Sequence, residues 1–251
     1  MRKNKLKIII NFLFIIGLCL ICFPLIKNTV TLVKIQKTVV SITADLPEPK
    51  ENERIELPTI ESYLTASSKT VGSGIGELMI PSQKIDIPIF AGLNNQQMLF
   101  GVGAMYPERD VLNENMVLLG HHLSMTDLLL GNIKDMQVDD PIFVSYLTES
   151  LQYRVIETKI IAETDLSVLQ NTQTPRLTLI TCDKPQRTDK RIVVTAEFVC
   201  QEKAGAIQEV KNHITQDKRI VQRSIVKYSL IPILIMIFIL VIMSYVIWRY
   251  I

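Results

Sequence analysis

The residue best placed for nucleophilic chemistry is Cys182. It ends the run RLTLITC at residues 176–182, which is rich in leucine and β-branched residues and predicts a strand, and a polar loop follows it. A cysteine attacks as its thiolate, so it needs a positive group or a base nearby to react at neutral pH. Because the end of a strand on a rigid sheet would present such a thiol, we take Cys182 as the candidate nucleophile.

Candidate partners for this thiol lie at the ends of two other predicted strands. His121 and His122 close the strand at residues 115–120, and Arg191 opens the strand at 191–199. Antiparallel pairing of that last strand with the cysteine's strand would bring Arg191 beside the thiol. Side chains alternate along a strand, so only one of the two histidines can point at it. We expect the cysteine, one histidine and the arginine to meet at one end of the sheet.

The same residue types also fit structural roles. Cys182 could form a disulfide with Cys200, and a non-catalytic β domain that binds wall or surface proteins would need no reactive thiol. A zinc site is disfavoured, because adjacent histidines on a strand diverge and His121, His122 and Asp183 with one cysteine do not make a four-ligand structural site.

Other reactive side chains are expected to be inert. Cys19 and Cys22 match a redox spacing but lie in an apolar run, where thiols behave as small hydrophobes. Arg187 lies in the middle of a polar loop and His213 in an amphipathic segment, and both are expected to be exposed.

The elements that would position the reactive groups are mostly strands. Between residues 71 and 199, short runs rich in Ile, Val, Leu, Phe and Tyr alternate with clusters of Asn, Asp, Gly, Pro and Ser. The predicted strands are residues 76–80, 84–90, 115–120, 140–147, 151–161, 176–182 and 191–199. About eight strands in this length predict a mainly β fold, either a small closed barrel or a sandwich. Residues 95–106 and 126–136 break the pattern and are predicted to be short helical or irregular segments.

Two uncharged runs, at residues 8–26 and 228–248, explain the high mean hydropathy of +0.26. Each has about the 20 apolar residues that cross a membrane. The basic cluster before the first run places both ends of the chain in the cytoplasm and the intervening residues outside. A cleavable signal peptide also fits the first run, but no small-x-small site follows it before Lys27.

These runs divide the chain. We expect a cytoplasmic basic tail at 1–7, a span at 8–26, an extracellular stalk at 27–70, a β domain at 71–200, an amphipathic helical linker at 201–227, a span at 228–248 and a cytoplasmic end at 249–251. The prolines and charged run of the stalk are typical of a segment with little core of its own. Ile207, Val210 and Ile214 follow a helical period, so the linker could pack on the domain or lead into the second span.

The charge balance argues against a nucleic-acid partner. The formal net charge is +2, and residues 71–199 carry 10 Lys or Arg against 16 Asp or Glu. A surface that binds a phosphate backbone needs a basic excess, which this domain lacks.

The run TLITC at residues 178–182 resembles the TLxTC signature of sortases, the membrane-anchored cysteine transpeptidases of Gram-positive bacteria. Other parts of the family pattern occur in order: residues 75–93 resemble the opening strand pair, 101–108 the segment after it, LLGHH at 118–122 the strand with the catalytic histidine, and RIVV at 191–194 the strand with the catalytic arginine. The resemblance covers about residues 74–199. It implies a closed eight-stranded sortase-type β-barrel with short helices, flanked here by two transmembrane helices.

The resemblance also implies roles. Cys182 matches the nucleophile that attacks an LPXTG-type sorting signal between Thr and Gly and holds a thioacyl intermediate. His121, on the family's Gly-His spacing, matches the acid that protonates the leaving amine and then deprotonates the incoming one. Arg191 matches the arginine that steadies the substrate oxygen, and Thr181 assists positioning. The acceptor would be an amine of a lipid-linked peptidoglycan precursor, and no cofactor is required.

The resemblance also raises the possibility of a calcium site. Some sortases bind calcium between loops, and Glu108, Asp110 and Glu114 supply carboxylates ahead of the histidine strand.

The core motifs resemble the housekeeping class A type, and no Asp-Pro-aromatic lid precedes the domain. A C-terminal span is familiar from pilin-polymerising sortases, which are the alternative, and a hydrolase would use the same residues. The expected location is the cell membrane, with two spans and the catalytic domain outside.

Overall fold

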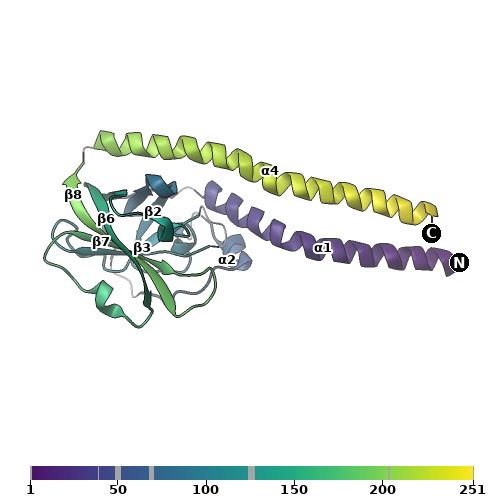
Figure 1. Ribbon diagram of the computed structural model, residues 1–251, viewed down its shortest axis with the longest axis horizontal. Coiled ribbons are helices and arrows are strands. Elements are labelled where there is room, and N and C mark those ends of the chain that lie inside the picture. Colours follow the sequence, from purple (N-terminus) through teal and green to yellow (C-terminus); the bar gives the residue numbers. More distant parts are fainter. Residues whose placement is uncertain are drawn as a thin grey trace. The chain divides into compact units, whose positions relative to one another are not determined.

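The computed structural model describes residues 2–38, 40–48, 52–67, 71–123, 128–202 and 204–250. The chain forms two compact units, one of Lys34–Asp217 and the other of Met1–Val33 together with Lys218–Ile251. All the strands belong to the first unit, which carries the candidate site (Figure 1).

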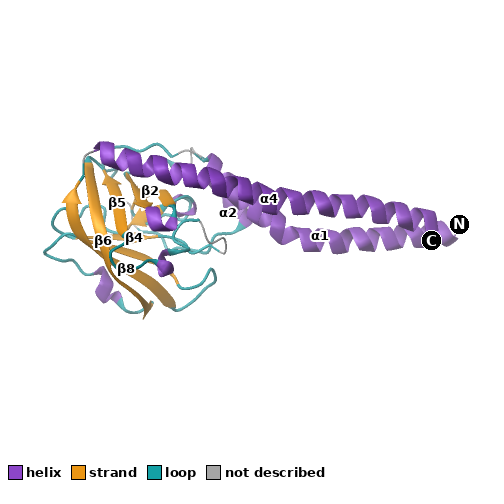
Figure 2. Cartoon of the chain, turned by 45° about the horizontal axis from the view of Figure 1, so that its top comes forward, coloured by secondary structure: helices purple, strands orange, loops and turns teal. Residues whose placement is uncertain are grey.

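Among the described residues, eight strands close into one barrel of mixed pairing (Figures 1 and 2). They are β1 (Gly76–Ile80), β2 (Ile85–Ala91), β3 (Val102–Ala104), β4 (Asn115–Leu119), β5 (Pro141–Tyr146), β6 (Glu149–Ala162), β7 (Arg176–Cys182) and β8 (Lys190–Gln201). The order around the barrel is β1-β2-β3-β4-β7-β8-β6-β5. The β2–β3 and β4–β7 pairs are parallel and the others antiparallel. The prediction of a closed, mainly β barrel is confirmed.

The strand that the sequence did not predict is β3. It has three residues and lies within the segment 95–106 that was predicted to be helical or irregular. A run as short as Val-Gly-Ala offers no alternation by which to recognise a strand, and only its pairing with β2 and β4 defines it. The helical part of that prediction corresponds to the short 3₁₀ helix η2 (Gln97–Leu99).

In the described part of the chain, three further 3₁₀ helices connect strands: η1 (Pro81–Gln83), η3 (Ile133–Asp135) and η4 (Leu166–Leu169). The η3 helix falls in the second segment predicted to be helical or irregular, 126–136, of which residues 126 and 127 lie outside the described residues. Ile133 is fully buried in the barrel core, so this segment contributes to the packing of the barrel's interior.

The strands around the candidate site carry two separate apolar clusters. Alternate residues of β7 and β8, such as Leu179 and Val194, belong to the main barrel core. The residues between them, Ile180 and Val193, join Val117 of β4 in a second cluster on the opposite face of these strands. We call this second group the outer-face cluster. Because side chains alternate, Cys182 is on the same face of the strands as Ile180, and Arg191 is on the same face as Val193. The outer-face cluster therefore packs beside these two candidate residues.

The segment predicted to be a stalk contributes to the packing of the barrel unit. Helix α2 (Ile60–Thr65) has Thr59 as its N-cap, whose side chain accepts a hydrogen bond from the Ser62 backbone in a capping box. Tyr63 is buried and meets the ring of Phe100 edge-on, with the ring centroids 6.1 Å apart. The composition of residues 27–70 indicated little core, whereas these side chains are part of one.

The amphipathic linker packs on the barrel. It forms the first turns of helix α4 (Ala204–Tyr250), and Ile207 and Ile214 are buried against Met79 of β1 and Phe143 of β5. The Lys211 ammonium lies 2.6 Å from a carboxylate oxygen of Glu77. Of the two possibilities that the sequence left open, packing on the domain is therefore observed.

The terminal unit is made of helix α1 (Arg2–Lys37) and the remainder of α4. The Asn11 side-chain amide donates a 3.0 Å hydrogen bond to the Ser244 hydroxyl. Within the described parts of the chain, no helix combines the length and the apolar character needed to cross a membrane. The spans predicted at 8–26 and 228–248 are thus found as helix but are not supported as transmembrane segments.

Candidate active site

Cys182 and Arg191 face each other across a strand pair. Strands β7 and β8 are antiparallel, and their register pairs Cys182 at the end of β7 with Arg191 near the start of β8. The expected juxtaposition of thiol and guanidinium is therefore produced by the fold. It follows from the short loop of residues 183–189, which joins the two strands.

The surroundings of Cys182 favour the neutral thiol. Burial raises its pKa above the ordinary value, the positive charge of Arg191 lowers it, and the negative charges of Asp183 and Glu163 raise it. The net result is a raised pKa, so the resting residue is a thiol at neutral pH. Some other group must take its proton before it can attack.

His121, the candidate for exchanging that proton, lies at the end of the strand next to β7. It lies two residues beyond β4, which runs parallel to β7, and the Gly120 amide still donates to the Ile180 carbonyl at 3.1 Å. The ring is buried, with 6 % of the residue exposed, and within the described part of the chain its Nε2 has no hydrogen-bond partner. Burial lowers the pKa of His121 to about 4. A neutral imidazole with an uncommitted nitrogen can accept a proton and return it.

His122 has a different environment. Its Nδ1 lies 2.8 Å from the backbone carbonyl oxygen of Cys182. Because a carbonyl oxygen only accepts, this ring nitrogen is the donor. The two adjacent histidines thus diverge as expected: His122 tethers the backbone of the cysteine, and His121 keeps its ring nitrogen uncommitted.

Thr181, predicted to assist positioning, is buried, and its hydroxyl donates a 2.9 Å hydrogen bond to the Gly120 carbonyl. Gly120 itself has no room for a side chain, since a Cβ there would lie 2.8 Å from Leu130 side-chain atoms. The bond ties the cysteine's strand to the residue before His121. Any positioning by Thr181 therefore acts through this hydrogen bond to Gly120 and not through contact with a substrate.

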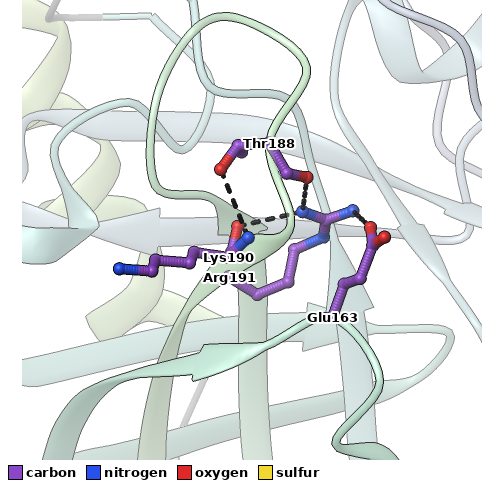
Figure 3. Close-up of polar contacts among 4 residues, drawn as sticks. All are labelled: Glu163, Thr188, Lys190 and Arg191. Carbon is purple, nitrogen blue, oxygen red and sulfur yellow. Dashed lines mark hydrogen bonds and ion pairs between the residues drawn. The ribbon is translucent and has the colours of Figure 1, made fainter.

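Arg191 is held by three acceptors (Figure 3). Its Nη1 donates to the carbonyl oxygens of Thr188 at 2.8 Å and Lys190 at 2.9 Å, and its Nη2 lies 2.7 Å from Oε2 of Glu163. Glu163 was not among the predicted site residues. In the sequence, Glu163 stands two residues beyond the strand predicted at 151–161, and this position points to Arg191 only once β6 is known to pair with β8.

The other candidate residues lie apart from this group. Cys200 pairs with Gln152, nine residues along β8 from Arg191, which is roughly 30 Å at the rise of a strand. Cys182 and Cys200 are both free thiols. The disulfide considered from the sequence is therefore not formed, and Arg187 is exposed as predicted.

Two of the three proposed calcium ligands, Asp110 and Glu114, already accept hydrogen bonds. The Asp110 carboxylate accepts from the Leu112 amide and the Asn113 side chain, and the Glu114 carboxylate accepts from the Asp110 amide. Over the described residues, no group of three or more His, Cys, Asp or Glu side chains is arranged to hold a metal ion. Calcium binding at Glu108, Asp110 and Glu114 stays a prediction.

The barrel is closed and of mixed pairing, and it carries a cysteine, a histidine and an arginine at the adjoining ends of β7, β4 and β8. This combination defines a class of thiol acyltransferase. Comparison with known proteins supports this. Residues 78–199 match the model of the sortase domain family. The sortase A of Listeria monocytogenes serovar 1/2a is 34% identical over 212 residues, which cover 81% of this chain and 94% of that protein. The sortase A of Streptococcus agalactiae serotype III is 25% identical over 252 residues, covering 91% of this chain and 98% of the relative.

A solved structure agrees with these relatives. The crystal structure of Listeria monocytogenes sortase A superposes with a TM-score of 0.50 at 34% identity, over 53% of this chain and 92% of that one. The chain belongs to the sortase family. It is a sortase-type cysteine transpeptidase, and its described barrel is the catalytic fold of that family.

Proposed function

We propose that this sortase is of the housekeeping, class A type and joins surface proteins to the cell wall. It cleaves an LPXTG-like sorting signal between Thr and Gly and transfers the acyl group to an amine of a lipid-linked peptidoglycan precursor. The observation that carries the proposal is the placement of Cys182 opposite Arg191, with the uncommitted Nε2 of His121 on the neighbouring strand. The curated relatives named sortase A support the class.

The first half of the reaction forms a thioester. The Cys182 thiol gives its proton to His121, and the thiolate sulfur attacks the carbonyl carbon of the signal's Thr. Negative charge then develops on the carbonyl oxygen, where an N–H of Arg191 stabilises it. Collapse of this intermediate breaks the Thr–Gly C–N bond, and the His121 imidazolium protonates the leaving glycine amine.

The second half reverses the proton transfers. The acceptor amine attacks the thioester carbon, and His121 takes the proton that the amine loses as the new amide forms. The thiolate of Cys182 leaves and recovers a proton from the His121 imidazolium. The enzyme returns to its resting thiol and neutral imidazole, which is the form that the raised and lowered pKa values of Cys182 and His121 favour.

The test uses the full-length chain and a fluorogenic LPXTG peptide, without an acceptor or with glycine, a diamino acid or a lysine peptide, and identifies products by mass. We expect cleavage and ligation in the wild type and in Cys200→Ala, and neither in Cys182→Ala. Cleavage without ligation to any acceptor would support a hydrolase, and ligation only to a lysine peptide would support a pilin-polymerising enzyme. Failure of the wild type to cleave a panel of sorting peptides would overturn the proposal.

Attachment to the cell membrane, with the barrel outside, is part of the same proposal. Its support is the pair of uncharged runs at 8–26 and 228–248 and the basic residues before the first of them. Carbonate extraction of cell membranes followed by immunoblotting tests it. Release of the chain into the carbonate supernatant would contradict anchoring by spanning helices.

A further inference from the structure

Glu163 is fixed at the site by the barrel itself. It follows directly after β6, whose register with β8 pairs Ile161 with Arg191 and Ala162 with Lys190. Its own amide donates a 2.7 Å hydrogen bond to the Asp189 carbonyl, so the pairing continues for one residue beyond the strand. Because side chains alternate, Glu163 is on the same face as Ile161 and can reach its diagonal neighbour Arg191.

Glu163 forms an ion pair with Arg191. Among the residues that the structure describes, Glu163 is the one carboxylate in an ion pair with Arg191, at 2.7 Å. The other two acceptors, the carbonyls of Thr188 and Lys190, are neutral and belong to the same loop end (Figure 3). The charged guanidinium strengthens all three bonds, and the bond to Glu163 also joins opposite charges, so Glu163 helps to set the direction of the guanidinium from outside its own loop.

Some N–H groups of the Arg191 guanidinium have no acceptor in the described structure. Arginine has five N–H groups, two on each Nη and one on Nε. In the described structure, Nη1 uses both of its hydrogens on carbonyls and Nη2 uses one on Glu163. The Nε–H and the second Nη2–H of Arg191 are left to bind a substrate oxygen. Glu163 therefore orients the arginine without using up the donors that the reaction needs.

Glu163 also acts on the nucleophile through its charge. Arg191 lowers the pKa of the Cys182 thiol and Glu163 raises it. The carboxylate thus offsets part of the effect of the arginine on the thiol. Loss of this charge should make Cys182 ionise at lower pH, while loss of the hydrogen bond should let the guanidinium turn away from the substrate.

We propose that Glu163 is a positioning residue for transpeptidation, which holds the Arg191 guanidinium beside the end of β7 so that its Nε–H and second Nη2–H face the substrate oxygen. The inference rests on the proposed function of the site, since it assigns Arg191 to that oxygen. It adds a carboxylate that acts through another residue and has no contact of its own with the reacting atoms.

The experiment separates the charge of Glu163 from its hydrogen bond. In E163Q the amide oxygen can still accept from Nη2 but the charge is lost, whereas E163A loses both. Glu157→Ala is the matched control, because Glu157 is a half-exposed carboxylate on the same strand, paired with Lys159 at 2.8 Å. For each full-length variant, kcat and KM are measured with the sorting peptide. The rate of iodoacetamide alkylation at Cys182 is measured from pH 6 to 10, with the modified peptide identified by mass.

We expect E163A to lose about tenfold in kcat with KM changed less than about twofold, since a misdirected donor weakens the transition state more than the bound substrate. E163Q should stay within about threefold of the wild-type kcat because an acceptor for Nη2 is retained. Cys182 of E163Q should be alkylated several-fold faster at pH 7, because removing the negative charge of Glu163 lowers the thiol pKa and leaves more thiolate. The control should match the wild type in both assays.

The inference is overturned if E163A keeps the wild-type kcat, if E163Q loses as much activity as E163A, or if the alkylation profile of E163Q equals that of the wild type. Should E163A melt below the assay temperature, E163Q carries the test alone. A wild-type chain that cleaves no sorting peptide would refute the proposed function. The alkylation measurement would still report whether Glu163 acts on Cys182.

Discussion

Protonation of the buried His121 should destabilise the fold in acid. Burial lowers the pKa of this imidazole from 6.5 to about 4, so the unfolded chain binds the proton more tightly than the folded one. A group with a lowered pKa of this kind costs stability as the pH falls from the unfolded value towards the folded value. With these two values, linkage gives a loss of about 2 kcal/mol between pH 7 and 5, and about 3 kcal/mol by pH 4.

The assay is guanidinium unfolding of the full-length chain at pH 7, 6, 5 and 4.5, for the wild type, His121→Gln and a control. Glutamine does not titrate, so the gap in unfolding free energy between wild type and variant should change by about 2 kcal/mol between pH 7 and 5, in favour of the variant. His213→Gln is the control, because His213 is exposed on α4, and its gap to the wild type should not follow this course. A gap for His121→Gln that is independent of pH would show that the imidazole is not held neutral by burial.

Other parts of the structure make separate predictions. Gly120→Ala would place a methyl 2.8 Å from the Leu130 side chain, so we expect a loss of about 1–3 kcal/mol in denaturant unfolding and a lower kcat/KM. Ile214→Ala removes a buried contact of α4 with Met79 and should cost about 2–5 kcal/mol without changing kcat at a temperature where the variant is folded. Alkylation of Cys182 should keep speeding up from pH 7 to 9, because burial raises its thiol pKa above the ordinary value, and a rate that is flat over this range would contradict it. EGTA tests the calcium ligands predicted at Glu108, Asp110 and Glu114. Because the Asp110 and Glu114 carboxylates already accept hydrogen bonds from their own loop, cleavage in EGTA should stay within about twofold of the rate in calcium, and a large loss would support calcium binding there.

The barrel could be predicted from the sequence because most of its strands are long enough to form recognisable runs of apolar and β-branched residues. Strand β7 ends at Cys182 and β8 begins one residue before Arg191, and a short loop between antiparallel strands leaves little freedom in how they pair. The position of His121 at the end of β4 was equally visible. The three-residue β3 was not, since its pairing partners alone distinguish it from a loop.

The sequence by itself therefore determined the reactive residue types, their places at strand ends and the family that uses them. The tertiary structure decided which groups surround each one. Burial that lowers the pKa of His121, the tether from His122 to the Cys182 carbonyl and the ion pair from Glu163 to Arg191 all join residues at least 28 positions apart or depend on packing. Short-range patterns specify the strands, but the closure of β6 onto β8 and β4 onto β7 sets the charges and donors around the thiol.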